Sequence, residues 1–228
     1  MEHKDKTAVD KYEELKELLE QHRSLDNAES MAAYMKHHFV FYGISTVERR
    51  KLIRPFLKEE KKQGGIDWEL LDACFQDDHR EMQYIGIDIL NAMQKWLRYE
   101  DIALIEPYLR TKQWWDSIDA FDTLIGDIGL SDQRVDGLML TWSKDDDFWM
   151  NRLAIDHQLT RKEKTNTKLL KAILLNNLGS KEFFVNKAIG WSLREYSKTN
   201  PTWVYEFIEQ YKADMHPLSI REASKYLG

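Results

Sequence analysis

The chain has 228 residues, of which 43% are hydrophobic and 12% aromatic, and its formal net charge is −6. Eight Trp and this hydrophobic content exclude a disordered chain. The single cysteine, Cys74, excludes an intrachain disulfide framework and a Cys-based zinc site. Because no apolar run of 18 residues occurs, we expect a cytoplasmic protein with no membrane partner.

No segment has the composition of a linker between domains. The chain holds ten Gly and four Pro, and Gly64-Gly65 is the one doublet typical of a loop. A chain of this length buries a sizeable core as one large domain or as a continuous repeat array. We therefore expect a single domain over residues 1–228, present as a monomer.

The charges are unevenly distributed. Residues 64–147 carry 7 Lys or Arg against 19 Asp or Glu, whereas residues 148–228 carry 13 against 8. A basic C-terminal third indicates a face for a polyanion, although solvated helix faces explain the same charges equally well.

Helical periodicity runs through almost the whole chain, and alternation typical of strands is absent. Segments 45–48, 78–81 and 219–222 each match a capping box or its Asp variant, which predicts a helix start at each. The fold class is therefore all-α.

A weak internal repeat predicts how the helices are arranged. Residues 82–88 resemble residues 150–156, which in turn resemble residues 185–191. The sequence separation between the first two segments is near twice that between the last two. Repeats of this length favour helical units stacked side by side. We expect a right-handed-type α-solenoid of HEAT-like repeats, with matching helices lining one concave groove.

Two tryptophans lie outside the apolar seams of their predicted helices. Trp115 and Asp119 are one turn apart, about 100° from a seam on the same helix. The residues of that seam are Trp114, Ile118, Phe121, Ile125 and Ile128. Trp191 lies in a basic stripe with i, i+4, i+7, i+11 spacing, formed with Lys187, Arg194 and Lys198. An aromatic ring among cations is typical of nucleic-acid backbone binding, while packing between repeats is the alternative for both tryptophans.

Arg152 shares its helical stripe with apolar residues, so an anion is expected beside it. The sequence leaves two anions open, namely an acid of the neighbouring repeat or a phosphate. Taken alone, Asp119 is best explained as an ordinary helix-surface acid, and its case as a catalytic group rests on Trp115 four residues before it. The seven His show no metal-binding spacing, so we expect no metal and no cofactor.

Several long motifs, in order over nearly the whole chain, closely resemble the AlkD-type DNA alkylation-repair glycosylases. They are residues 33–36, 41–44, 48–50, 114–119, 126–128, 152–155, 180–184, 187–191, 193–196 and 198–201. The resemblance implies a fold of HEAT-like repeats whose concave face binds duplex DNA. It also implies excision of positively charged N3- and N7-alkylated purines.

By this resemblance the catalytic carboxylate falls on Asp119, and two cleft tryptophans fall on Trp115 and Trp191. The cleft arginine falls on Arg152, and a further cleft aromatic falls on Tyr34. With the basic stripe, the residues expected to bind DNA are Arg152, Lys187, Arg194, Lys198 and Tyr34. The acidic middle third departs from what DNA binding favours. A HEAT-like scaffold for another protein and a catalytically weakened paralogue therefore remain the alternatives.

Overall fold

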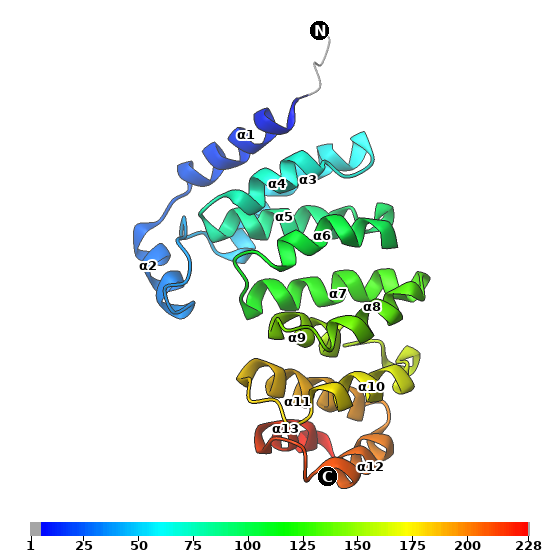
Figure 1. The fold of residues 1–228 in the computed structure, drawn as a ribbon. Coiled ribbons are helices and arrows are strands. Elements are labelled where there is room, and N and C mark those ends of the chain that lie inside the picture. The colour runs from blue at the N-terminus through cyan, green and yellow to red at the C-terminus, as the bar shows by residue number, and fades with distance from the viewer. Residues whose placement is uncertain (1–5, 228) are drawn as a thin grey trace. The chain divides into compact units, whose positions relative to one another are not determined.

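The computed structural model describes residues 6–227, and along these it has thirteen α-helices and no β-strand (Figure 1). The chain divides into two compact units, residues 1–97 and 98–228. Each unit is described by itself, and one domain over residues 1–228 stays a prediction. None of the described helices is both long and apolar enough to span a bilayer.

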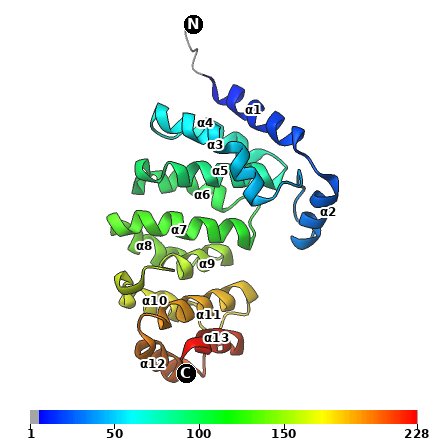
Figure 2. The ribbon, with the colours of Figure 1, turned by 180° about the vertical axis from the view of Figure 1, so that it is seen from behind.

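The first unit is built from five helices. They are α1 (Ala8–Gln21), α2 (Leu25–Tyr34), α3 (Thr46–Gln63), α4 (Trp68–Gln76) and α5 (Arg80–Ala92). Helix α4 packs between α1 and α5, and α3 contacts both of these (Figure 2). Leu15, Ile53, Leu70 and Ile85 are fully buried in its core.

Of the three predicted N-caps, the one at Ser45 is confirmed and the other two are wrong. Ser45 does cap α3, accepting a backbone hydrogen bond at 3.3 Å. The N-cap of α5, however, is His79 instead of Asp78. Glu81 does not close a box, because its carboxylate accepts the backbone N–H groups of residues 42–44 at 2.8–3.1 Å.

The third box fails for a similar reason. Helix α13 (Pro217–Ala223) begins before Ser219, and its N-cap is His216. The Ser219 hydroxyl donates to the Asn186 carbonyl at 2.7 Å. Both misplaced boxes therefore contain side chains that bind groups distant in sequence, which the local pattern does not reveal.

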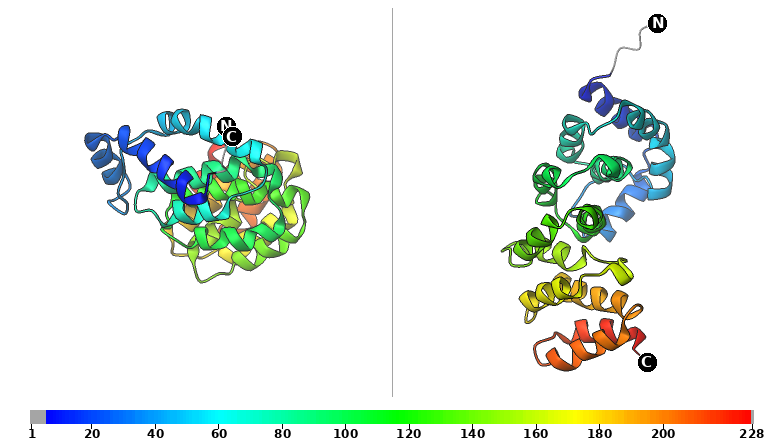
Figure 3. Two further views of the ribbon diagram at one scale, coloured as in Figure 1. Left: turned by 90° about the horizontal axis from the view of Figure 1, so that it is seen from above. Right: turned by 90° about the vertical axis from the view of Figure 1, so that its right-hand side faces the viewer.

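The second unit has two rows of helices. The odd-numbered row contains α7 (Trp115–Ser131), α9 (Phe148–Asp156), α11 (Phe183–Ser197) and α13, each packed on the next. The other row contains α8 (Arg134–Trp142), α10 (Thr167–Asn177) and α12 (Pro201–Tyr211), while α6 (Ile102–Leu109) packs on α7. Figure 3 shows the successive pairs stacked from α7 to α13. This is the HEAT-like α-solenoid arrangement expected from the repeat, and the expected groove stays a prediction.

The seam predicted on α7 is confirmed except at its first residue. Ile118, Phe121, Ile125 and Ile128 are buried. Trp114 lies outside the helix as its extended N-cap, with φ −161° and ψ 165°. Its ring packs on Phe184 and Trp149, at centroid distances of 5.2 and 5.7 Å. This aromatic cluster covers the start of α7, beside the residues described next.

Candidate active site

Arg152 and Asp119 form a bidentate ion pair between α9 and α7. Arg152 Nε donates to one carboxylate oxygen at 2.7 Å, and Nη2 donates to the other at 2.9 Å. Nη1 donates to the Phe184 carbonyl of α11 at 2.8 Å. The Arg152 side chain is 2% exposed, whereas the Asp119 side chain is 25% exposed. A buried guanidinium thus holds a carboxylate that solvent still reaches.

This pair answers the question that the sequence left open about Arg152. The anion beside it is an acid of the neighbouring repeat, not a phosphate, because Asp119 on the adjacent helix already occupies the guanidinium. With its side chain buried and its donors engaged, Arg152 holds Asp119 in place. A direct contact between Arg152 and DNA stays a prediction.

Two further acids lie behind the ion pair. Asp122 is 3% exposed and Asp156 is 1% exposed, and with Asp119 they bring carboxyl oxygens within 4.8 Å of one another. The Thr123 hydroxyl donates to Asp122 at 2.9 Å. Among residues 6–227 neither carboxyl oxygen of Asp156 has a hydrogen-bond partner, and one lies 3.9 Å from Arg152 Nη2.

Burial controls the charge of these two acids. It raises the pKa of Asp156 to about 8, since the attraction of Arg152 only partly offsets the loss of solvation. Burial, and after it the neighbouring Asp156, raises the pKa of Asp122 well above its ordinary range. At neutral pH Asp156 therefore keeps its proton, and burial favours the protonated form of Asp122. The charges of Arg152 and Asp119 then balance within the cluster.

The spacing of the three acids also suits a divalent cation. Arg152, however, already supplies a positive charge beside them, and burial favours the protonated forms of the two inner acids. Since a metal ion would compete with the guanidinium for Asp119, we assign no metal to this cluster.

Trp191 is half-buried on α11 and is surrounded by three cations. Arg152 Cζ and Lys187 Nζ each lie 5.4 Å from its ring centre, and Arg194 Cζ lies 5.7 Å away. Each distance is within the range of a cation–π contact. Lys187 and Arg194 of the predicted stripe therefore contact Trp191, and Arg152 links this ring to Asp119. Trp115 is half-buried as the first residue of α7, one turn before Asp119.

A buried glutamate of α13 engages the basic stripe. Glu222 is 4% exposed and accepts from Lys187 at 3.1 Å, Arg194 at 2.8 Å and Lys225 at 2.8 Å. The Lys225 ammonium, and with it that of Lys187, lowers the pKa of Glu222 to about 2 against the effect of burial. Two cations expected to bind DNA are thus already paired with a carboxylate.

The remaining predicted DNA-binding residues are Lys198 in the second unit and Tyr34 in the first. Lys198 is exposed, pairs with Glu195 at 2.5 Å and lies over the Tyr226 ring at 5.2 Å. Tyr34 ends α2 in the first unit and is 70% exposed. Because the two units are described separately, its expected place in the cleft stays a prediction.

The sequence did not reveal the roles of Asp122, Asp156 and Glu222. Asp122 shares the stripe of Asp119, and Asp156 is four residues after Arg152, so their positions carried a weak signal. Glu222 carried none, because its contacts depend on how α13 packs against α11.

The second unit is therefore a HEAT-like helical protein with an arginine-held carboxylate next to a tryptophan in a cationic setting. The family model described as DNA alkylation repair enzyme matches residues 15–227, and the chain belongs to this family. A solved structure described as a predicted DNA alkylation repair enzyme from Enterococcus faecalis is 38% identical, with a TM-score of 0.84. The match covers 90% of this chain and 97% of that chain. A search of curated proteins finds no match.

Proposed function

We propose that the chain is a DNA N-glycosylase that excises positively charged N3- and N7-alkylated purines from duplex DNA. Membership of the DNA alkylation repair family supports the substrate class. The observation that carries the proposal is the partly exposed carboxylate of Asp119, fixed by a buried arginine beside Trp191. Departure of a cationic base leaves a positively charged sugar, and a carboxylate held in a fixed position stabilises that charge.

An alkylated purine that carries a positive charge is already a good leaving group. When the bond from C1′ to the base nitrogen breaks, its electron pair neutralises the base and leaves an oxocarbenium-like sugar. Asp119 stabilises that cation and accepts a proton from the water that adds to C1′. Because Arg152 holds both oxygens of Asp119, the carboxylate stays oriented through the reaction.

The two tryptophans contribute contacts with the sugar. Trp191 and Trp115 offer ring faces to the cationic deoxyribose, an attraction of roughly 0.5–2 kcal/mol each. Lys187, Arg194 and Lys198 contact backbone phosphates, which for the first two means competing with Glu222. The reaction needs no cofactor, and we propose that a cytoplasmic monomer carries it out.

Release of free base tests the activity. Duplex DNA treated with a methylating agent contains 7-methylguanine and 3-methyladenine, and chromatography identifies the bases released by the protein. Both should appear in proportion to enzyme and time. No release of either base by the folded wild type contradicts the proposal.

The ion pairs with Glu222 favour a second candidate, a paralogue with weakened DNA binding or a scaffold for another protein. Cations already neutralised by a carboxylate attract phosphate less strongly. Affinity for duplex DNA measured against salt separates the candidates, since a glycosylase should lose affinity steeply as salt rises. A protein scaffold should show no such dependence.

A further inference from the structure

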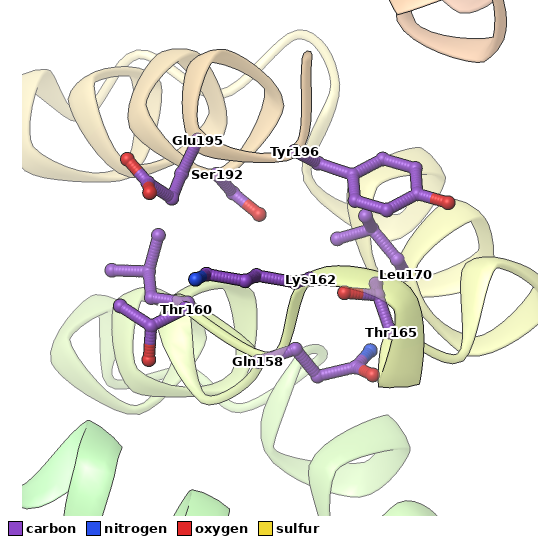
Figure 4. Close-up of a pocket in the computed structure, with 9 residues that line it drawn as sticks. Gln158, Thr160, Lys162, Thr165, Leu170, Ser192, Glu195 and Tyr196 are labelled. Atoms are coloured by element: carbon purple, nitrogen blue, oxygen red, sulfur yellow. The ribbon is translucent and has the colours of Figure 1, made fainter. Parts of the chain in front are cut away.

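The loop between α9 and α10, residues 157–166, carries three cations within four residues. They are Arg161, Lys162 and Lys164. The α9–α10 loop borders a cleft of about 370 Å³ against α7, lined on the helix side by Thr123, Gly126, Asp127 and Leu130. On its other side a smaller cleft separates it from α11, where Lys162 lies between Gln158 and Ser192 (Figure 4). The loop thus fills the space between α7 and α11 beyond the end of α9.

The loop lies on the same side of the odd-numbered row as the candidate active site. Gly126, in the first cleft, follows Asp119 by two helical turns, a rise of about 10 Å. Glu195, in the second, follows Trp191 by one turn. A ligand held at Asp119 and Trp191 therefore lies about 10 Å along α7 from the first cleft and one turn along α11 from the second.

The path of the loop is fixed by contacts with α7 and α10. Arg161 Nη2 donates to the Gly126 carbonyl at 2.5 Å, and a Cβ at Gly126 would lie 2.1 Å from the His157 carbonyl. The buried Gln158 exchanges two hydrogen bonds with the Asn166 backbone, at 2.8 and 3.3 Å.

Two residues of the loop adopt the left-handed conformation without being glycine. They are Thr160, at φ 68°, and Lys162, at φ 52°. This conformation is costly for side-chain-bearing residues and persists where the surroundings impose it. Lys162 is therefore held in position, although its side chain is exposed.

The loop cations lack the carboxylate partners that other cations near the site have. None of the three forms an ion pair with any residue from 6 to 227, whereas Lys187 and Arg194 share Glu222. The Arg161 Nε–H is buried and has no acceptor in the part of the chain that the structure describes. Burial lowers the pKa of Arg161, outweighing the attraction of nearby acids of α7 and α8. The positive charge of the α9–α10 loop is therefore not neutralised by ion pairs within residues 6–227, and an external anion would stabilise it.

We propose that the α9–α10 loop is a phosphate-binding subsite for the backbone of duplex DNA, with Lys162 and Lys164 as its contacts. The inference rests on the proposed function. Each strand of B-DNA carries a phosphate every 3.4 Å or so along its axis, so a sugar held at Asp119 brings others to the loop. Of the acids lining the two clefts, Glu195 is paired with Lys198, and neither Asp127 nor Glu163 forms an ion pair with a loop cation among residues 6–227.

Salt-dependent binding tests the subsite. A double variant, Lys162→Gln with Lys164→Gln, is compared with Lys168→Gln, an exposed lysine on α10. Fluorescence anisotropy gives the affinity of each protein for an unmodified duplex between 50 and 200 mM salt. The double variant should bind at least fivefold more weakly at 100 mM and lose about one to two units of the log–log salt slope. The α10 control should match the wild type.

A charge-preserving double variant, Lys162→Arg with Lys164→Arg, separates charge from folding and should retain wild-type affinity. An unchanged slope in the Gln double variant overturns the subsite, and so does lost affinity in the Arg double variant. Absence of duplex binding by the wild type overturns it as well. A loop-dependent slope in a wild type that releases no base supports the subsite and contradicts only the glycosylase activity.

Discussion

Arg152 of α9 binds both carboxylate oxygens of Asp119 of α7, and the acid remains partly exposed while the arginine is buried. A guanidinium makes this two-point contact, and an ammonium cannot. The arrangement therefore fixes the direction of the Asp119 carboxylate as well as its charge. A substitution at Arg152 that keeps its positive charge but not its two-point contact separates the effect of orienting Asp119 from the effect of charge.

We expect Arg152→Lys to lower base excision at least tenfold, because the remaining positive charge no longer orients Asp119, and a tenfold loss corresponds to about 1.4 kcal/mol. Single-turnover rates on alkylated duplex DNA measure the effect. The control is Arg134→Lys, which removes an exposed bidentate contact with Asp132. Equal rates for both variants would mean that orientation by Arg152 has no part in the reaction.

Asp156→Asn should stabilise the protein increasingly as pH rises from 5 to 8. The folded-state pKa of Asp156 is raised to about 8, above the unfolded value of about 3.9. Its contribution to stability is thus present in full below pH 4 and is lost as pH rises towards 8. For an uncoupled group the slope would be about 1.4 kcal/mol per pH unit, and coupling to Asp122 spreads it over the pair.

Thermal unfolding of the wild type and Asp156→Asn at pH 5, 6, 7 and 8 measures this difference. The gap in Tm should widen by several degrees across the range. The exposed Asp146→Asn serves as the control and should show a constant gap. A constant gap for Asp156→Asn would show that this carboxyl group is already ionised at pH 5.

Glu222→Gln should strengthen duplex binding. The substitution removes the charge that pairs with Lys187 and Arg194, so both cations become available to phosphate. We expect affinity at 100 mM salt to rise at least threefold, and the log–log salt slope to steepen by roughly one unit per released contact. Glu209→Gln, which frees Lys212 just after α12, is the control and should change neither quantity. Unchanged binding by Glu222→Gln would place Lys187 and Arg194 outside the DNA contact.

Gly126→Ala should loosen the α9–α10 loop. The added Cβ would lie 2.1 Å from the His157 carbonyl, so the loop or α7 must move, at a cost of about 1–3 kcal/mol in unfolding free energy. Gly137→Ala in α8 has nothing within 4 Å of the new Cβ and should instead gain about 0.5–1 kcal/mol. Denaturant unfolding of both variants is the measurement. If the free energy of unfolding changed in the same direction in both variants, the close approach of Gly126 to the His157 carbonyl would not constrain the loop.

The helical fold could be predicted because its evidence is local. The apolar seam of α7 and the stripe around Trp191 follow from side-chain spacing on one helix, and both are present. The start of α7 was placed too early, since Trp114 has the same apolar character as the seam but packs outside the helix. Spacing does not distinguish these two environments.

Most of the candidate site depends on contacts between helices, which spacing does not determine. The need for an anion at Arg152 followed from its apolar neighbours, but Asp119 as that anion did not. Glu81 and Glu222 both fit capping boxes and instead bind groups distant in sequence. A glutamate in a local motif competes with tertiary partners, and here the tertiary partners prevail.

The most direct test of the proposed activity compares single-turnover excision of 7-methylguanine by the wild type, Asp119→Asn and Asp146→Asn. Asn keeps the shape of Asp119 and removes its charge, so we expect its rate to fall at least tenfold, while Asp146→Asn keeps the wild-type rate. Circular dichroism and Tm verify that the Asp119 variant is folded, since Arg152 loses a charged partner. A folded Asp119→Asn protein with the wild-type excision rate would contradict the assignment of Asp119 as the catalytic carboxylate.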